Sequence, residues 1–415
     1  MAGLPDGEPA PDDGALPDAA RAELGAVPFG LYLHVPFCAA RCGYCDFTTY
    51  APGELAARPG SDPISYLDAV ERELDLAVRV LGAPPLVSTV FVGGGTPSLL
   101  GGDGLARLLA AVRTRFPVAA DVEVTTEANP ESTTPELLEK ARAAGYTRLS
   151  VGMQSAAPHV LRVLDRRHTP GRVGEVVAAA HRAGFEHVNV DLIYGTPGET
   201  DADLAASAAA ALSYGTDHVA AYALVVEEGT ALARRVRRGE VAAPDDDVLA
   251  DRYELLDGLL RAAGLEWYEV SNWARSPAAA SRHNRLYWEN AHWWGVGPGA
   301  HSHVGGVRWW NTRHPGTYYD RVAAGLSPAV GRELLTAADR RTERVLLGVR
   351  VRDGLPVAAL AGTAAPGTPD PAALGRAREL VEEGLLEPAG WDRGRLVLTD
   401  RGRLLADLVV RRLLG

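Results

Sequence analysis

Cysteine is scarce in this chain of 415 residues, which contains three, all within eight positions: Cys38, Cys42 and Cys45. Because no other cysteine is present to pair with them, the sequence argues against a disulfide framework. Lysine is scarcer still, since Lys140 is the only one and arginine supplies the other basic residues. Given the high content of alanine, glycine and proline, we interpret this as a GC-rich genome bias rather than as an arginine-based function.

Long apolar runs and an excess of positive charge are also missing. No apolar run approaches 18 residues, so we expect no segment to span a membrane. The net charge is −11 at pH 7, which argues against a dedicated nucleic-acid-binding protein, since such proteins are usually basic. Residues 1–27 are acidic and rich in Pro, Gly and Ala, and they lack the basic and apolar regions of a secretory signal. We expect this tail to be disordered.

The three cysteines follow the spacing C-x3-C-x2-C. Soft sulfur ligands this close together suit a metal or an iron–sulfur centre. A structural zinc site takes four protein ligands, so zinc would need a histidine as the fourth, and the spacing differs from that of a zinc finger or ribbon. A four-iron cluster held by three thiolates keeps one iron open for another ligand. The sequence therefore predicts a metal centre able to do chemistry, with structural zinc as the alternative.

Strands and helices alternate between residues 29 and 224, a pattern typical of a parallel α/β sheet. We predict six strands, at residues 31–37, 89–92, 121–127, 148–152, 187–193 and 218–223. Amphipathic helices are expected between them, at residues 65–81, 105–115, 135–144, 172–183 and 203–212. Asp62 and Pro63 fit the cap and first turn of the first helix. Six such units predict an α/β fold, an incomplete (β/α)6 barrel of the TIM type.

Polar and glycine residues cluster where the predicted strands end, which is where such a barrel has its site. The cysteines follow the first strand, and the next four strands are followed or ended by Gly93-Gly94-Gly95-Thr96-Pro97, Glu127 and Asn129, Gln154 and Ser155, and Asp191. Taken alone, each of these features is explained by an ordinary turn or a solvated cap, without a functional role. Their clustering after separate strands predicts a common site.

The rest of the chain is expected to pack beside the barrel. A helix at residues 246–263 leads into a region dense in aromatic residues and histidine, and the final stretch reads helix–helix–hairpin–helix, with the last helix at 400–414. This final α+β stretch resembles a winged helix, although the acidic chain favours a packing or lid role over DNA binding. The predicted division is a tail at 1–27, a barrel at 28–265, a connecting region at 266–332 and a winged-helix-like domain at 333–415.

The cysteine motif, with Tyr44 directly before the last cysteine, resembles the radical S-adenosylmethionine (SAM) superfamily. The segments YLHVPFC, GGGTPS and HNRLYW resemble its coproporphyrinogen dehydrogenase/HemW branch, from about Leu31 to the C-terminus. The resemblance implies that Cys38, Cys42 and Cys45 hold a [4Fe-4S] cluster whose open iron binds SAM, which one electron from the cluster cleaves. It also implies a low-potential electron donor, and an oxygen-sensitive cluster leads us to expect a cytoplasmic protein.

The resemblance further implies a set of SAM-binding residues. Gly94 and Gly95, with Thr96 beside them, let the backbone approach the methionine moiety, and Glu127 accepts hydrogen bonds from ribose hydroxyls. Tyr32 is expected near the sulfonium and Tyr44 near the nucleoside. In the dehydrogenase a second SAM is bound at the positions matched here by Gln154, Arg166 and Asp191. Whether a second SAM binds to this chain, and whether SAM is cleaved in turnover, stays open.

One departure separates the two branches. The dehydrogenase has a further cysteine two residues after the motif, where this chain has Phe47. That difference, the short acidic tail and the HNRLYW segment match the haem chaperones of the HemW type. These proteins bind haem and pass it to haem proteins, so haem and acceptor haem proteins are the expected partners, with transient contact to membrane haem proteins left open and no nucleic acid.

Histidines supply the candidate haem ligands, since histidine is a common axial ligand and aromatic side chains pack on a porphyrin. The candidates are His283, His292 and His301, with His303 in the same segment; for each, packing in an interface is the alternative. Two other functions were weighed. One is an oxygen-independent coproporphyrinogen III dehydrogenase, which converts two propionates to vinyl groups in porphyrin biosynthesis. The other is an iron–sulfur DNA-binding regulator. No catalytic residue is predicted, and whether the protein is an enzyme stays open.

Overall fold

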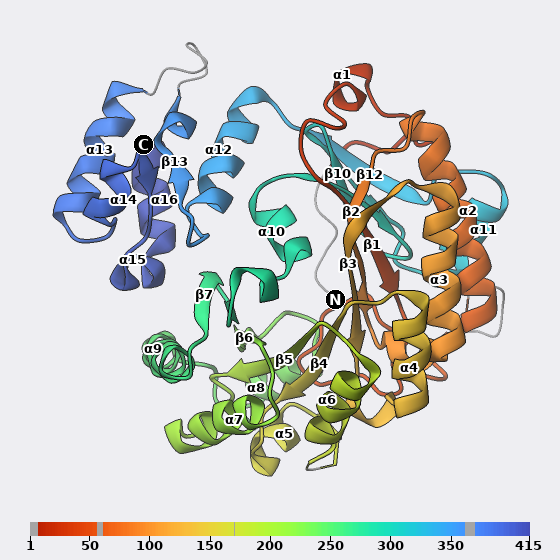
Figure 1. Ribbon diagram of the computed structural model, residues 1–415, viewed down its shortest axis with the longest axis horizontal. Coiled ribbons are helices and arrows are strands. Elements are labelled where there is room, and N and C mark those ends of the chain that lie inside the picture. The colour runs from red at the N-terminus through yellow and green to blue at the C-terminus, as the bar shows by residue number, and fades with distance from the viewer. Residues whose placement is uncertain (1–6, 56–60, 170, 362–369) are drawn as a thin grey trace.

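A computed structural model describes residues 7–55, 61–169, 171–361 and 370–415 (Figure 1). Six parallel strands form its centre, in the order of the sequence. They are β1 (Phe29–Val35), β2 (Val87–Gly94), β3 (Val118–Ala128), β4 (Arg148–Gln154), β5 (His187–Tyr194) and β6 (His218–Ala223). All six coincide with the strands that the sequence predicts.

Helices connect these strands. They are α2 (Pro63–Leu81), α3 (Gly101–Arg115), α4 (Pro135–Ala144), α5 (Pro158–Val163), α6 (Arg172–Ala183) and α7 (Asp201–Ser213), with 3-10 turns η1 (Pro97–Leu100) and η2 (Pro130–Ser132). All of these helices except α5 overlap the positions expected from amphipathic periodicity. Helix α2 begins as expected, because the Asp62 carboxylate accepts hydrogen bonds from the N–H groups of Ile64 and Ser65, both 3.0 Å long.

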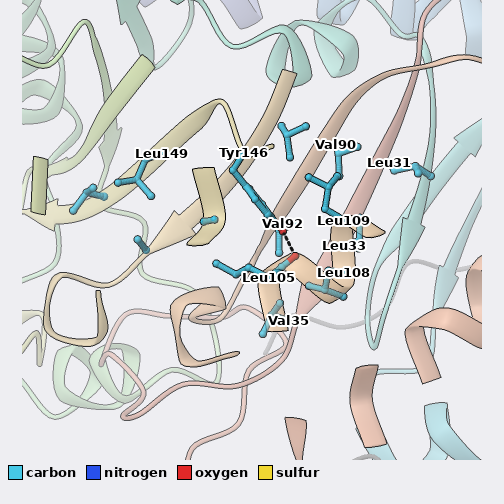
Figure 2. Packing of buried hydrophobic residues seen from close by; sticks show 14 of the residues in the cluster. Leu31, Leu33, Val35, Val90, Val92, Leu105, Leu108, Leu109, Tyr146 and Leu149 are labelled. Carbon is cyan, nitrogen blue, oxygen red and sulfur yellow. Dashed lines mark hydrogen bonds between the residues drawn. The ribbon is translucent and has the colours of Figure 1, made fainter. Parts of the chain in front are cut away.

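The core lies between the sheet and this layer of helices. Leu31 and Leu33 of β1 pack in the same cluster as Val90 and Val92 of β2 and the leucines of α3 (Figure 2). Figure 2 also shows the Tyr146 hydroxyl donating to the carbonyl oxygen of Leu105, at 3.0 Å, which satisfies a polar group inside the apolar layer.

Additional strands extend both edges, so the sheet has twelve strands and does not close into a barrel. On one side β9 (His292–Val296) pairs with β1 in parallel, and the antiparallel strands β10 (His301–Val304), β11 (Val307–Asn311) and β12 (Ala329–Leu334) follow. On the other side β8 (Asn272–Ala274) and β7 (Glu266–Glu269) join β6. The central helices and remaining turns are α8 (Ala231–Arg237), α9 (Asp246–Ala262), η3 (Pro277–Ala279), α10 (Arg282–Trp288) and α11 (Pro315–Ala323).

The C-terminal segment has a hydrophobic core of its own, formed by residues between Val345 and Leu413. Its elements are α12 (Ala337–Gly348), β13 (Leu355–Pro356), η4 (Val357–Leu360), α13 (Pro371–Glu382), α14 (Pro388–Asp392), β14 (Arg395–Leu396), α15 (Asp400–Leu404) and α16 (Ala406–Leu414). The expected last helix is interrupted at Leu405, which leaves the helical region at ψ 25°. The expected hairpin carries the short helix α14, because Pro388 starts a helical turn at its tip.

The N-terminal tail departs from the sequence-based expectation. Residues 7–27 are not disordered: Glu8 pairs with Arg332 of β12, Asp12 with Arg321, and Glu23 with Arg340 of α12, and a short helix α1 (Asp18–Arg21) lies between. Composition indicated too little apolar surface to fold alone, but these carboxylates find arginine partners on the folded core. Residues 1–6 lie outside the described part. The predicted boundaries at 27, 265 and 332 stay predictions.

Candidate functional site

The cysteines occupy a loop after β1 that is hydrogen-bonded at its base and at its tip. At the base, the N–H of Cys38 donates to the Tyr50 carbonyl at 3.0 Å, and the N–H of Tyr50 donates to the Pro36 carbonyl at 2.7 Å. At the tip, Gly43 donates to the carbonyl of Leu164 and accepts from the N–H of Leu232. The three thiols are free and partly buried, so the loop presents them without a disulfide.

A cavity of about 400 Å³ opens at the carboxyl ends of the central strands and is lined by all three cysteines. It brings together most of the residues that the sequence assigns to the site, namely Cys38, Cys42, Cys45, Tyr44, Gly94, Gly95, Thr96, Glu127, Gln154, Arg166 and Asp191. Asn129 also lines it. Tyr32 does not. Its hydroxyl lies 2.9 Å from Nδ1 of His34, and its ring packs beside Phe91 and His283.

Polar atoms surround the thiols. Within the described residues, Nε of Arg166 is buried without a hydrogen-bond partner, and the buried Thr49 hydroxyl is a donor toward the Cys38 thiol. The Thr96 hydroxyl reaches Sγ of Cys38 and Nη1 of Arg166 reaches Sγ of Cys42, each at 3.7 Å. Such donors suit sulfur that becomes negatively charged on binding iron, so the residues fit an iron–sulfur centre. Burial raises the pKa of Cys45 to about 11, so this thiol keeps its proton until a metal displaces it.

The spacing of the thiols bears on the kind of metal centre. In the described part of the chain, no group of three or more histidine, cysteine or acidic side chains is arranged to hold a single metal ion. A four-iron cluster places its cysteines on separate irons, so it needs thiols around one cavity rather than around one point. The arrangement of Cys38, Cys42 and Cys45 meets that requirement.

The glycine turn at the end of β2 packs closely against the start of the cysteine loop. Gly94 has a φ of +110°, and a Cβ there would lie 2.6 Å from the His34 ring. A Cβ on Gly95 would lie 2.4 Å from the Phe37 carbonyl oxygen. The N–H of Thr96 donates to that same oxygen at 2.7 Å. These glycines therefore let two loops meet, and they leave bare backbone facing the cavity.

Two partly buried carboxyl groups line the cavity together with the cysteines. Burial, aided by the negative charge of Asp191, raises the pKa of Glu127 to about 8, while the Gly94 N–H donates to its Oε2 at 2.9 Å. Burial raises the pKa of Asp191 to about 6 against hydrogen bonds from Ser150 at 3.0 Å and Asn189 at 2.6 Å. Both groups are thus placed to accept hydrogen bonds from a polar ligand in the cavity.

The end of β4 is distorted where it meets the cavity. Gln154 has a φ of +66°, unusual for a residue other than glycine, and the register of β4 with β5 shifts between Gly152 and Gln154. Nη2 of Arg166 donates to the Gly152 carbonyl at 2.8 Å. Ser155, by contrast, turns away from the cavity and lies 3.2 Å from the Ser207 hydroxyl. The strained backbone keeps Gln154 on the cavity wall.

Several lining residues were missed from the sequence. They are Arg41, Thr49, Ser150, Tyr222 and Val225. Ser150 and Tyr222 lie within β4 and β6, and nothing in the local pattern separates them from ordinary strand residues. One signal could have identified Ser150. It lies on β4 two residues before Gly152, the partner of Asp191 on β5, so strand alternation puts it on the same face of the sheet as Asp191.

The candidate haem histidines fall into different environments. His283 is 1% exposed, and its two ring nitrogens lie 2.8 Å from the Thr89 and Tyr287 hydroxyls. Burial lowers its pKa to about 3. His292 is also occupied, because Nε2 lies 3.3 Å from the Glu23 carbonyl oxygen and Nδ1 accepts from the Gly305 N–H. Neither residue presents a ring nitrogen to a ligand from outside.

His301 and His303 lie on β10 and differ in exposure. The His301 ring is exposed and stacks on Trp310, with ring centroids 6.0 Å apart. Within the described residues it has no hydrogen bond to its ring nitrogens. His303 is buried, with Nδ1 at 2.9 Å from the Ala291 carbonyl oxygen and Nε2 unpartnered among described residues. His301 is therefore the candidate that an incoming ligand reaches without rearrangement.

Comparison with known proteins places these features in context. A model of the radical SAM superfamily matches residues 32–211, and a model of the HemN C-terminal domain matches residues 335–405. The heme chaperone HemW of Mycobacterium tuberculosis (strain H37Rv) is 58% identical over 394 residues, covering 95% of this chain and 97% of that protein. The heme chaperone HemW of Bacillus subtilis (strain 168) is 32% identical over 388 residues, covering 92% and 98%.

A solved structure shows the same fold. Coproporphyrinogen III oxidase (HemN) from Escherichia coli, a radical SAM enzyme, superposes with a TM-score of 0.79. The alignment covers 95% of this chain and 92% of that chain, at 23% sequence identity. The open sheet and the C-terminal unit are thus shared between the two proteins, whereas identity this low carries no statement about activity.

Proposed function

The chain belongs to the HemW family of radical SAM proteins, and from this premise we propose that it binds haem and transfers it to acceptor haem proteins. The observation that carries the proposal is the cavity, where Cys38, Cys42 and Cys45 face Glu127 and Asp191. The alignments with these haem chaperones cover 92–95% of this chain and 97–98% of the chaperones. A [4Fe-4S] cluster and SAM are the cofactors of this superfamily.

The residues of the cavity divide into two groups. Three thiolates would each hold one iron, and the fourth iron would take SAM. The bare backbone at Gly94 and Gly95, with Glu127 opposite, would bind the methionine and ribose parts, and Tyr44 the nucleoside. Gln154, Arg166 and Asp191 offer further polar contacts on the far wall. When bound, the cluster supplies one electron to SAM.

Phe47 disfavours the dehydrogenase. Its side chain is 59% exposed and lines the cavity just after Cys45. A phenyl ring carries neither a proton nor a thiolate charge, so it cannot replace the further cysteine of the dehydrogenase motif. The DNA-binding alternative is disfavoured by the net charge of −11.

We place the haem iron on His301. Its ring is exposed, and the buried Trp310 indole stacked behind it fixes the orientation of the imidazole. His283 and His292 would each have to give up two contacts within the protein first. We further propose a cytoplasmic location, a low-potential electron donor as partner and no nucleic-acid ligand. Among the described helices, none has the length and apolar character needed to cross a membrane.

Haem titration of the anaerobically reconstituted protein tests this proposal. We expect the wild type and His283→Ala to give the same absorbance spectrum with haem, whereas His301→Ala should lose the spectrum of a histidine ligand. Incubation with SAM, reductant and coproporphyrinogen III should release no CO2. Conversion of coproporphyrinogen III would contradict the chaperone function, and a spectrum unchanged in His301→Ala but lost in His283→Ala would move the ligand to α10.

A further inference from the structure

A cluster of exposed arginines stands out on this acidic chain. Five of them, here called the basic patch, come from two short segments beside the cysteine loop. They are Arg162 on α5 and Arg167 in the segment after it, and Arg234 and Arg237 on α8 with Arg238 directly after it. Of these, Arg238 forms an ion pair with Glu240 at 2.5 Å. No ion pair is found for the other four among the described residues.

Helices α5 and α8 pack against each other. Nη1 of Arg235 on α8 donates to the Val163 carbonyl of α5 at 2.9 Å, and Leu232 shares an apolar cluster with Val160 and Leu164. Arg237 and Arg238 follow Arg234 by three and four residues, so both lie on the same helix face as Arg234. The exposed acidic residues nearby, Asp165, Glu228 and Glu240, are fewer than the arginines.

Both helices are bonded directly to the tip of the cysteine loop. The Leu164 carbonyl, just after α5, accepts from the Gly43 N–H at 3.1 Å, and the Leu232 N–H of α8 donates to the Gly43 carbonyl at 2.8 Å. Gly43 lies between Cys42 and Cys45. Arg166, between the patch arginines in sequence, reaches Sγ of Cys42. The patch therefore lies on segments that are hydrogen-bonded to the tip of the cysteine loop, close to the Cys42 sulfur.

We propose that the basic patch docks an acidic electron-donor protein that carries a low-potential one-electron centre. This inference rests on the proposed function, because it requires a reducible cluster at the cysteines. Charge complementarity selects such a partner: uncompensated guanidinium groups on a protein of net charge −11 attract an acidic surface and orient it. The docked donor would face Gly43, so the electron would pass from the donor centre to the cluster, which is reduced as the donor is oxidised.

Nucleic acid and anionic membrane fit the patch less well. Single-stranded nucleic acid is usually bound by basic residues interleaved with exposed aromatic side chains, and none is exposed on α5 or α8. Membrane-surface helices bury a wide apolar face in lipid, whereas the apolar face of α8 is packed inside the protein against α5.

Rapid-mixing reduction of the reconstituted full-length protein tests the proposal. The probe is reduced plant-type [2Fe–2S] ferredoxin, an acidic one-electron donor of low potential. The patch variant combines Arg162→Ala, Arg167→Ala, Arg234→Ala and Arg237→Ala. The control variant removes four exposed arginines elsewhere, Arg72, Arg79, Arg393 and Arg411. Both variants change the net charge equally.

We expect the patch variant to be reduced by ferredoxin about tenfold to a hundredfold more slowly than wild type at low salt, with the difference shrinking as salt screens the charges. The control variant should stay within about twofold of wild type. Dithionite should reduce all three equally. Equal ferredoxin rates in wild type and patch variant, whether fast or slow, would overturn the docking surface.

Two further results have distinct meanings. A patch variant that lost binding to single-stranded DNA or to phosphatidylserine vesicles, while its ferredoxin rate stayed unchanged, would overturn the donor assignment. Absence of any dithionite-reducible absorbance in the wild type would overturn the cluster, and with it the proposed function on which this surface depends.

Discussion

At the scale of single residues, the three thiols differ in the donors that reach them. The Thr96 hydroxyl approaches Cys38, the Arg166 guanidinium approaches Cys42, and the backbone N–H of Phe47 donates to Cys45. Hydrogen bonds to sulfur influence the potential of an iron–sulfur cluster. Because each cysteine has a different donor, the three are not interchangeable, even though all three are needed to hold the cluster.

The first prediction concerns these ligands. Replacing Cys38, Cys42 or Cys45 by alanine should each abolish the brown iron–sulfur absorbance after anaerobic reconstitution, because two thiolates cannot hold four irons. Iron and sulfide analysis checks this, with Thr96→Val as a control that keeps every thiol. A single mutant that kept a full complement of iron and sulfide would contradict the three-thiolate site. Zinc in place of iron after anaerobic isolation would favour the zinc alternative.

Glu127 gives a second prediction. At pH 9, where a carboxyl with a pKa of about 8 is ionised, Glu127→Ala should weaken SAM binding by roughly 1.5–3 kcal/mol, the range for a hydrogen bond to a charged group, and should leave the iron content unchanged. Calorimetric titration of the reconstituted protein with SAM measures the loss. Glu136→Ala, on the exposed face of α4, is the matched control. Equal SAM affinity in Glu127→Ala and wild type would remove this residue from the site.

Residues could be predicted from the sequence where a motif follows a strand end, and not elsewhere. Cys38, Gly94 and Glu127 were placed in the cavity because parallel strands end at one edge. Tyr32 was assigned by resemblance, but it does not line the cavity, and its hydroxyl lies 2.9 Å from Nδ1 of His34 on β1. Tyr222 lines the cavity from within β6, and no local pattern separates it from an ordinary strand residue.

At the scale of elements, one buried carboxyl ties α2 to the strands added beside β1. Glu73 of α2 accepts hydrogen bonds from the Gly297 N–H, the Asn311 amide and the Tyr318 hydroxyl, at 2.7, 2.7 and 2.6 Å. These donors come from the loop after β9, from β11 and from α11. Burial nevertheless raises the pKa of Glu73 to about 7. The Glu73 carboxyl thus links these three elements to α2. The free energy of burying it depends on whether it is protonated.

The third prediction follows from the sign of this shift. The folded protein binds the Glu73 proton more tightly than the unfolded chain, so its stabilising contribution is complete below the unfolded pKa of about 4.3 and is lost as pH rises through about 7. Between pH 5 and pH 8 the wild type should lose roughly 2–3 kcal/mol of unfolding free energy through this group.

Urea unfolding of wild type and Glu73→Gln at the two pH values measures that difference. The variant should be less stable at pH 5, because an amide accepts fewer of the three hydrogen bonds, but its stability should change less between pH 5 and pH 8. Glu139→Gln, exposed on α4, should follow the wild type. Parallel pH profiles for wild type and Glu73→Gln would show that the carboxyl stays ionised throughout.

Elements were predictable from the sequence where each carries its own periodicity. The strands from β1 to β6 and their helices alternate regularly, and their bounds differ little from expectation. Strands β9 to β12 were expected only as an aromatic connecting region. They are short, and β9 pairs with β1 across more than 250 residues, a contact that no local pattern indicates. The ordered N-terminal tail was missed for the same reason, since its partners are distant arginines.

At the scale of the whole molecule, one buried arginine joins the C-terminal unit to the core, beside more exposed ion pairs such as Arg261–Asp400. Both carboxylate oxygens of Asp257 on α9 accept from the Arg403 guanidinium of α15, at 3.1 and 2.6 Å. The guanidinium also lies over the rings of Trp267 and Tyr253, 4.7 and 5.3 Å from their centroids. Both charged side chains are less than 10% exposed, so the pair is shielded from water.

The last prediction concerns loss of the Arg403–Asp257 ion pair. Arg403→Met should destabilise the protein by about 3–5 kcal/mol, because it leaves the buried Asp257 carboxylate with fewer partners, the Trp273 indole N–H and Arg261. Since the C-terminal unit has its own core, we expect the loss to separate its unfolding from that of the sheet. Hydrogen exchange should then show α15 and α16 opening before the central strands.

Two variants make this test specific. Arg401→Met, an exposed position on the same short helix, should leave the unfolding transition unchanged. Asp257→Asn combined with Arg403→Met should recover part of the loss, because no buried charge then stays unpaired. If Arg403→Met unfolded in one transition at the wild-type midpoint, the ion pair would not hold the two parts together. The other contacts between them, such as the Arg261–Asp400 ion pair at 2.7 Å, would then suffice.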